Sequence, residues 1–337
     1  MGIGLGILVG TFLKLFIHTE LSKQISISNK YSEHKTARNL NNKSISISNL
    51  SLYNDEITIL SSKWNELASR NKDLNAGAYL MIINSNKFAQ INPDYILPAA
   101  STIKIPILLL VLEMLDNRKL FWNESLRLEK ELIGSGAGWM AYEQIGKVFP
   151  VHEVANEMIR VSDNTATNLL IKRLGGINII NTRFKEIGLT NTRINNLLPD
   201  LKGTNTTTAK DLALALELVD SGNFLTPQSR DLFREIMSTS ESNKLMPAGI
   251  LKGLGEIQEN IDNKLLIKGY RVYNKTGDIG ISYGDIGLIQ MPDGTRAIAS
   301  FIVKGPFNDK RSPELIRDMA AAIVEVIKPK SQLNQQN

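Results

Sequence analysis

Strand-like segments lie on both sides of a long helical stretch, and this order limits how the chain can fold. The segments with strand composition are 78–84, 87–91, 270–275, 283–290 and 297–303. Residues from 101 to about 250 instead show mostly helical patterns. We therefore predict an α/β (α+β) fold: an antiparallel five-stranded sheet with flanking terminal helices, plus an all-helical lobe formed by about residues 100–250.

The terminal helices are indicated by apolar spacing and by a start signal. Leu60, Trp64 and Leu67 recur at helical spacing and predict a first helix. Ser312-Pro313 provides a cap followed by proline, which predicts a last helix that runs to about Ile327. Both helices are expected to cover one face of the sheet, because a sheet must bury its apolar face against another layer.

Three short motifs carry the chemistry: Ser101-Thr-Ile-Lys104, Ser162-Asp-Asn164 and Lys275-Thr-Gly277. The Ser-x-x-Lys pattern alone is weak, because it also occurs at Ser32 and Ser69. The other two motifs occur once each, so their presence together and in this order is informative. The three motifs are expected to meet between the sheet and the helical lobe, where small-molecule pockets tend to form.

The context of the first motif predicts a helix that begins just after the serine. An apolar run from Ile105 to Leu115 follows the motif and is too short to span a bilayer. Pro106 is tolerated only near a helix start, which fixes the same boundary. Ser101 and Lys104 are then one turn apart and share a helix face.

These residue types suit nucleophilic catalysis without a histidine. Ser101 is the predicted nucleophile and Lys104 the predicted base, which must be neutral to take the hydroxyl proton. Burial and the neighbouring charge of Lys275 would both lower the pKa of Lys104. Ser162 is predicted to pass a proton to the leaving nitrogen.

The remaining motif residues are predicted to bind the substrate: Asn164, Lys275, Thr276, Gly277 and Asp278. Asn164 can hydrogen-bond Lys104 or a substrate amide. Lys275 and Thr276 offer a charge and a hydroxyl to a substrate carboxylate. A glycine in the strand allows close backbone approach, and the N–H groups of Ser101 and Asp278 are the predicted oxyanion hole.

Other catalytic classes lack their residues in this sequence. The three histidines are His18, His34 and His152, and no Gly-x-Ser-x-Gly motif occurs, which argues against a Ser-His-Asp triad. The chain has no cysteine and no His-Glu-x-x-His motif, so we expect no metal and no cofactor. The net charge of +5 favours solubility, and no basic stripe with interleaved aromatics predicts a nucleic-acid partner.

The segmentation of the chain follows its composition. Residues 1–18 are apolar around Lys14 and are predicted to be a signal or membrane anchor. Residues 19–54 are rich in Ser, Asn and Lys and are predicted to be a flexible linker. Residues 55–328 would form the serine hydrolase domain and 329–337 a polar tail. We expect a monomer in the cell envelope, exported to the periplasm or to the outer face of the inner membrane.

From about residue 55 to 328 the chain resembles the class A β-lactamase family, to which penicillin-binding proteins are related. The resemblance rests on segments 98–104, 161–166, 168–170, 174–176, 206–208 and 275–277. It implies a two-lobed fold of the kind predicted above. It also implies acylation of the serine by β-lactam amides, with neither metal nor cofactor.

One loop departs from the family pattern. β-Lactamases carry a Glu-x-x-Leu-Asn motif before the Thr-Thr-Thr segment, and its glutamate activates the deacylating water. Residues 192–205 here contain no glutamate, and Asp200 is their only acid. Asn196 and Asn205 lie near the places of a bracing arginine–aspartate pair, and Gly284 lies where some members have a carboxylate-binding arginine.

Three functional hypotheses follow from this resemblance and this departure. The leading hypothesis is a serine hydrolase that acylates on β-lactams and hydrolyses them slowly, because the loop glutamate is missing. The second is a D-Ala-D-Ala peptidase, or penicillin-binding protein, acting on peptidoglycan peptides. The third is a cell-envelope binding protein without turnover.

Overall fold

The computed structural model describes residues 53–327. The segment predicted as a signal or anchor, nearly all of the predicted linker and the polar tail lie outside the described residues. Among the described helices, none is long and apolar enough to cross a membrane.

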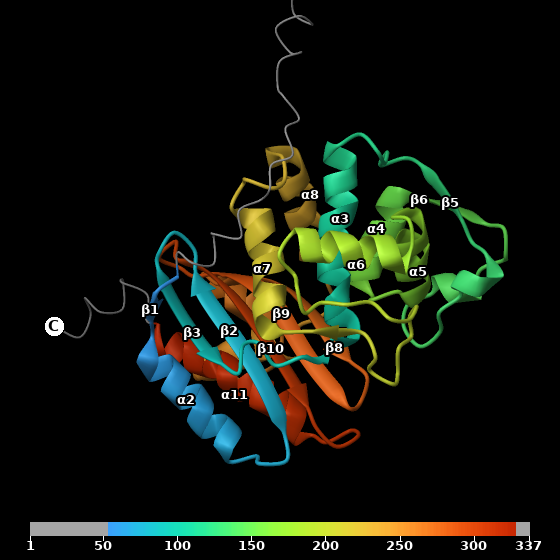
Figure 1. Ribbon diagram of the computed structural model, residues 1–337. Helices are drawn as coiled ribbons and strands as arrows, with labels where there is room; N and C mark the ends of the chain where they lie inside the picture. Colours follow the sequence, from blue (N-terminus) through green and yellow to red (C-terminus); the bar gives the residue numbers. More distant parts are fainter. Residues whose placement is uncertain (1–52, 328–337) are drawn as a thin grey trace, which may run out of the picture. The chain divides into compact units, whose positions relative to one another are not determined.

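A single large sheet organises the described part of the chain (Figure 1). Its strands are, in spatial order, β1 (Asp55–Glu56), β3 (Lys87–Ile91), β2 (Asn75–Ile82), β10 (Arg296–Lys304), β9 (Ser282–Gln290) and β8 (Arg271–Asp278). The five predicted strands are confirmed, and all their pairings are antiparallel. The sheet has a sixth strand, because β1 pairs with β3 in parallel. Two charged residues carry no strand pattern, so the sequence did not indicate β1.

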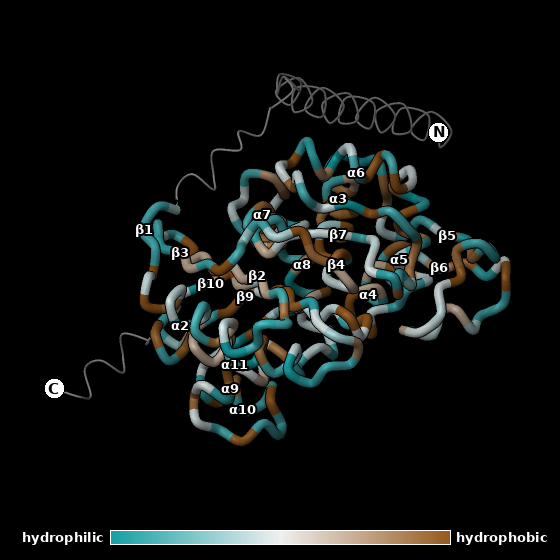
Figure 2. The backbone as a smooth tube through the Cα atoms, turned by 60° about the horizontal axis from the view of Figure 1, so that its bottom comes forward, coloured by the Kyte–Doolittle hydropathy of each residue, from teal (hydrophilic) through white to brown (hydrophobic). Residues whose placement is uncertain are grey.

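Helices α2 (Thr58–Ser69) and α11 (Arg311–Val326) cover one face of the sheet, as predicted. The indole N–H of Trp64 donates a 2.8 Å hydrogen bond to the carbonyl of Met319, and the same ring meets Phe301 edge-on at 5.6 Å. Helix α9 (Met246–Gly253) packs against α11, and α10 (Ile261–Ile267) packs against α9 (Figure 2). The last helix begins one residue before Ser312, so this serine lies inside it and is not its cap.

Helix α7 (Ala209–Asp220) packs on the opposite face of the sheet, against β2 and β10. Thr208 caps it through a hydrogen bond from the N–H of Asp211 to its hydroxyl. Helix α7 belongs to the helical lobe. The other helices of that lobe are α3 (Lys104–Asp116), α4 (Val151–Arg160), α5 (Asn164–Arg173), α6 (Ile177–Glu186) and α8 (Pro227–Ser238). Helix α3 is buried along its first nine residues, Lys104 to Leu112.

The helical lobe also contains short extended pairs that its helical sequence patterns did not indicate. Strand β4 (Leu97–Pro98) pairs with β7 (Thr206–Thr207), and β5 (Ser125–Arg127) pairs with β6 (Val148–Pro150). Single 3₁₀ turns connect the elements: η2 (Ala100–Ile103), η3 (Lys130–Leu132) and η4 (Met140–Tyr142). The lobe is therefore mainly, but not entirely, helical.

Two features of this fold determine where the candidate site lies: the edge strand β8 and the η2 turn. Strand β8 is one of the two edge strands of the large sheet, so one of its backbone edges lacks a strand partner there. It extends to Asp278, and the whole Lys-Thr-Gly motif therefore lies inside the strand rather than at its end. The η2 turn, which carries Ser101, packs against β8 and β9 at the base of α3.

Candidate active site

The structure brings the Ser-x-x-Lys and Ser-Asp-Asn motifs together around one amine. The Nζ atom of Lys104 lies 3.2 Å from the Oγ of Ser101 and 2.9 Å from the Oγ of Ser162. It also contacts the carbonyl oxygen of Ser162 at 2.6 Å and the Oδ1 of Asn164 at 3.0 Å. Residues from η2, α3 and the α4–α5 connection thus converge on a single point.

Lys104 has lost its contact with solvent, and this changes its protonation. Its exposed fraction is 0%. Burial holds the pKa of Lys104 well below its ordinary value, and the charge of Lys275 lowers the pKa further, against a smaller opposing effect of Asp163. A neutral amine keeps two N–H donors for the Ser162 carbonyl and Asn164, and its lone pair is then free to accept a hydroxyl proton.

Ser101 lies in a tight turn rather than in the body of a helix. The η2 turn precedes α3 directly, so Ser101 and Lys104 remain one turn apart. Gly277 of β8 faces this turn, and a Cβ added there would lie 2.8 Å from the N atom of Ser101 and 3.0 Å from that of Thr102. The glycine therefore permits strand β8 to approach the nucleophile turn, whereas its predicted role was to permit close approach of the ligand.

Ser162 adopts a backbone conformation that costs energy for a residue with a side chain. Its φ is +62°, in the left-handed region. The next residue, Asp163, has 0% exposure and fixes this conformation with three hydrogen bonds from backbone N–H groups. One comes from Ala166 at the start of α5, and two come from Trp139 and Met140.

Asn164 links the amine to the loop that follows η3. Its Oδ1 faces Lys104, while its Nδ2 donates a 2.8 Å hydrogen bond to the carbonyl of Ser135. The side chain is 5% exposed. The structure thus gives Asn164 the contact with Lys104, one of the two contacts predicted for it, together with an anchoring contact that the sequence did not indicate.

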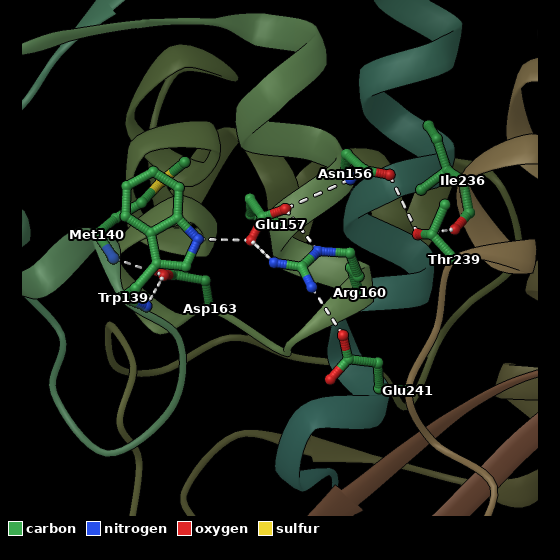
Figure 3. A network of polar contacts seen from close by, with 9 residues as sticks. All are labelled: Trp139, Met140, Asn156, Glu157, Arg160, Asp163, Ile236, Thr239 and Glu241. Carbon is green, nitrogen blue, oxygen red and sulfur yellow. Dashed lines mark hydrogen bonds and ion pairs between the residues drawn. The ribbon is translucent and has the colours of Figure 1, made fainter.

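A polar network connects Asp163 to helix α4 through Trp139 (Figure 3). The buried carboxylate of Glu157 accepts hydrogen bonds from the indole of Trp139 and from Arg160. Burial alone would raise the pKa of Glu157, but the hydrogen bonds from Arg160 and Trp139 outweigh it and lower the pKa. Arg160 also binds Glu241 at 2.7 Å, which ties α4 to the loop after α8.

Lys275 and Thr276, which are predicted to bind the substrate carboxylate, lie next to each other on strand β8. Lys275 is 1% exposed and donates a hydrogen bond to the carbonyl of Thr276 at 2.8 Å. Burial lowers the pKa of Lys275 to about 8, against an opposing effect of Asp285. It is therefore mostly charged at neutral pH. The side chain of Asp278 accepts the N–H of Gly280 and so stabilises the turn after the strand.

The loop of residues 192–205 is held by amides and by one carboxylate. The Oδ1 of Asn205 accepts the N–H groups of Asn195 and Asn196, at 2.7 and 2.9 Å. Asp200 uses both carboxylate oxygens locally, one for the hydroxyl of Thr204 and one for the N–H of Asn205. Contacts of the neutral amide of Asn205 therefore hold this loop together, and Asp200 braces it.

Two residues near the site lie outside the three motifs. The hydroxyl of Thr276 donates to the Oγ of Ser242 at 3.1 Å, and Asp285 lies fully buried on the neighbouring strand β9. Ser242 comes from a segment 34 residues from Thr276, whereas Asp285 lies directly opposite Thr276 on the neighbouring strand. Neither residue has a sequence pattern that would indicate it. Within residues 53–327 no cluster of histidine or carboxylate side chains could hold a metal ion.

Comparisons with known proteins agree with this geometry. A model of the Beta-lactamase enzyme family matches residues 59–327, so the chain belongs to this family of serine hydrolases. A β-lactamase of Bacillus amyloliquefaciens is 27% identical over 242 residues, covering 69% of this chain and 72% of the relative.

Solved structures give the same assignment of the fold. The structure of PBP-A matches with a TM-score of 0.74 and 39% identity, covering 84% of this chain and 98% of that chain. A leucine-to-glutamate mutant of PBP-A, solved as an acyl-enzyme complex with penicillin G, matches with the same TM-score and 38% identity. It covers 84% of this chain and 98% of that chain.

Proposed function

We propose that this protein reacts with β-lactams through a covalent ester on Ser101 and releases the acyl group slowly. The observation that carries this proposal is the position of Lys104, buried and 3.2 Å from the serine hydroxyl. A neutral amine at this distance takes the hydroxyl proton as the oxygen attacks the lactam carbonyl. The carbonyl oxygen would then be stabilised by the backbone N–H groups of Ser101 and Asp278.

The proton then has a short path to the leaving group. In the proposed step the carbonyl carbon–nitrogen bond of the lactam breaks, and the nitrogen must gain a proton. The hydroxyl of Ser162 lies 2.9 Å from the amine of Lys104. Ser162 would therefore give its proton to the nitrogen and recover one from the ammonium of Lys104, which restores the neutral base.

Release of the acyl group needs an activated water, and the loop does not supply a free base for it. Residues 192–205 contain no glutamate, and both oxygens of Asp200 already accept hydrogen bonds within the loop. A positioned general base contributes about 10²–10⁴-fold to such a step. Slow deacylation is therefore the expected behaviour of the ester.

The same slow release favours a second candidate function, a peptidase that acts on the D-Ala-D-Ala ends of cell-wall peptides. A peptide that ends in D-Ala-D-Ala has a terminal carboxylate, as penicillin has, and would present it to Lys275 and Thr276. The similarity to PBP-A, one structure of which is a penicillin acyl-enzyme, supports this candidate. Either function would place the protein in the cell envelope, on the outer side of the inner membrane.

Two assays on the purified protein separate these functions from a binding protein without chemistry. Hydrolysis of a chromogenic cephalosporin at many turnovers per enzyme would identify a β-lactamase. A fluorescent penicillin that labels the protein in a denaturing gel, without such turnover, would identify the slow-release enzyme. Absence of both signals would contradict the proposal and leave a binding protein.

A further inference from the structure

Ser242 lies beside the predicted carboxylate-binding residues but belongs to a loop between α8 and α9. Its Oγ accepts the hydroxyl proton of Thr276 at 3.1 Å, and the contact is partly buried. We propose that Ser242 is a second hydroxyl ligand for the substrate carboxylate and a determinant of preference for acidic ligands. This inference rests on the proposed function.

The place of this loop residue is fixed from the sheet side. The Nδ2 of Asn274, on strand β8, donates a 2.5 Å hydrogen bond to the carbonyl of Ser242. Asn274 is held in turn by both oxygens of Asp285, at 2.9 and 3.1 Å. Asp285 also accepts the N–H of Met246, four residues further along the chain from Ser242. The serine is thus attached to the sheet through its own carbonyl and through the end of its loop.

The place of this residue is also fixed from the helical lobe, by the network of Figure 3. The N–H of Glu241 donates to the carbonyl of Arg160 at 3.0 Å, and its carboxylate binds the guanidinium of the same arginine. Residue 241 is the immediate neighbour of Ser242, so the backbone that carries the hydroxyl is anchored to both lobes. Such anchoring orients the Ser242 hydroxyl before the substrate binds, and it reduces the conformational entropy that is lost on binding.

The chemistry of the surrounding groups indicates what this hydroxyl would bind. Lys275 provides the positive charge, and Thr276 and Ser242 provide two adjacent hydroxyls that can donate to an anion. Gly284 has no side chain to add a cation, and a Cβ there would lie 3.0 Å from the Cγ2 of Thr102. A carboxylate that displaces the contact between the two hydroxyls would accept a hydrogen bond from each of them. Each bond to the charged group would be stronger than the neutral bond that is lost.

The test compares acylation by penicillin G with acylation by its methyl ester, which lacks the carboxylate. The readout is the second-order rate constant for formation of the adduct, measured by mass spectrometry. We expect Ser242→Ala to lower this constant roughly tenfold for penicillin G, the loss typical of one hydrogen bond to a charged group. For the methyl ester we expect a change of less than about twofold, and Ser242→Thr should restore the rate with the acid.

A matched control is available two residues earlier in the same loop. The Oγ of Ser240 is buried and has no hydrogen-bond partner in the structure. Ser240→Ala should therefore leave both rate constants unchanged. Equal loss with acid and ester in Ser242→Ala, or no loss with either, would overturn the assignment of Ser242. Absence of any adduct in the unmodified protein would instead overturn the proposed function, and the carboxylate site with it.

Discussion

The amine of Lys104 lies 3.2 Å from the hydroxyl of Ser101 in a position closed to solvent. A charged lysine would be costly there, because burial disfavours its protonated form and Lys275 adds a second positive charge. The lysine is therefore suited to be a base at neutral pH. The arrangement explains why the site needs no histidine and why its two lysines must differ in charge.

Replacement of the nucleophile should abolish the covalent adduct. We expect Ser101→Ala to show no penicilloyl mass under conditions that fully label the unmodified protein, because the attacking hydroxyl is removed and the other hydroxyl beside Lys104, that of Ser162, is assigned to proton transfer. Ser69 provides the control, since it has the same Ser-x-x-Lys spacing but lies exposed on α2. Ser69→Ala should label normally. An adduct of full yield in Ser101→Ala would refute the assignment of the nucleophile.

The two lysines should respond differently to the charge of the ligand. Lys104→Ala should slow acylation by every ligand, by about 10²–10⁴-fold, because it removes the general base. Lys275→Ala should slow penicillin G by roughly 10–100-fold, the loss of one charge-assisted contact, and the methyl ester far less. If both variants lost equal activity with acid and ester, the division of roles would be wrong.

The pH profile of acylation should have two limbs with different origins. The rate should rise as Lys104 loses its proton, since its pKa lies well below the ordinary value. With penicillin G it should fall above about pH 8, where Lys275 loses the charge that holds the carboxylate. The methyl ester should lack the falling limb. The same fall with both ligands would mean that loss of the Lys275 proton acts on the chemistry and not on binding.

The sequence indicated the residues that meet at the site but not all of those that hold them in place. Ser101, Lys104 and Ser162 were indicated because their spacing is local and each motif is short. Ser242 was not, since its contact with Thr276 joins segments 34 residues apart and depends on how the loop crosses the edge of β8. The contact of Arg160 with Glu241, 81 residues apart, is of the same kind.

For the fold, too, the sequence indicated the elements that have a local pattern and missed those that depend on contacts between distant residues. The apolar strands and the terminal helices have periodic patterns that the sequence reveals. Strand β1 has none, because two charged residues pair with β3 only once α2 and the sheet have brought them together. The short pair of β4 with β7 also depends on residues distant in sequence. Such elements follow from tertiary packing rather than from propensity.

Asp163 should be more important for stability than its place between two predicted site residues, Ser162 and Asn164, suggests. Its carboxylate accepts three backbone N–H groups while fully buried. Asp163→Asn would turn an amide group toward these donors and leave at least one of them unpaired. We expect a loss of about 2–3 kcal/mol in the free energy of unfolding, measured by chemical denaturation. Asp231→Asn, at an exposed position on α8, should change it by less than about 0.5 kcal/mol.

A loss below about 1 kcal/mol in Asp163→Asn would contradict this structural role for the carboxylate. The acylation rate of the variant provides a second readout. It should fall as well, since the left-handed conformation of Ser162 depends on the contacts of the next residue.

Asp200 should brace its loop without activating water. Both of its oxygens accept hydrogen bonds from Thr204 and Asn205. We therefore expect Asp200→Asn to release a preformed penicilloyl group within about threefold of the normal rate, far below the effect of removing a general base. The decay of the adduct mass with time measures this rate directly. A tenfold or larger slowing, with the melting temperature unchanged, would identify Asp200 as the deacylation base.

The most direct test of the central claim is a rapid-quench time course of the unmodified protein with penicillin G, followed by mass spectrometry. We expect a fast burst in which nearly every molecule gains one penicilloyl group on Ser101, and then slow release over a much longer time. Steady hydrolysis without accumulation of the adduct would show that an efficient base activates the water. A chain that never gains the adduct would contradict the proposed acylation itself.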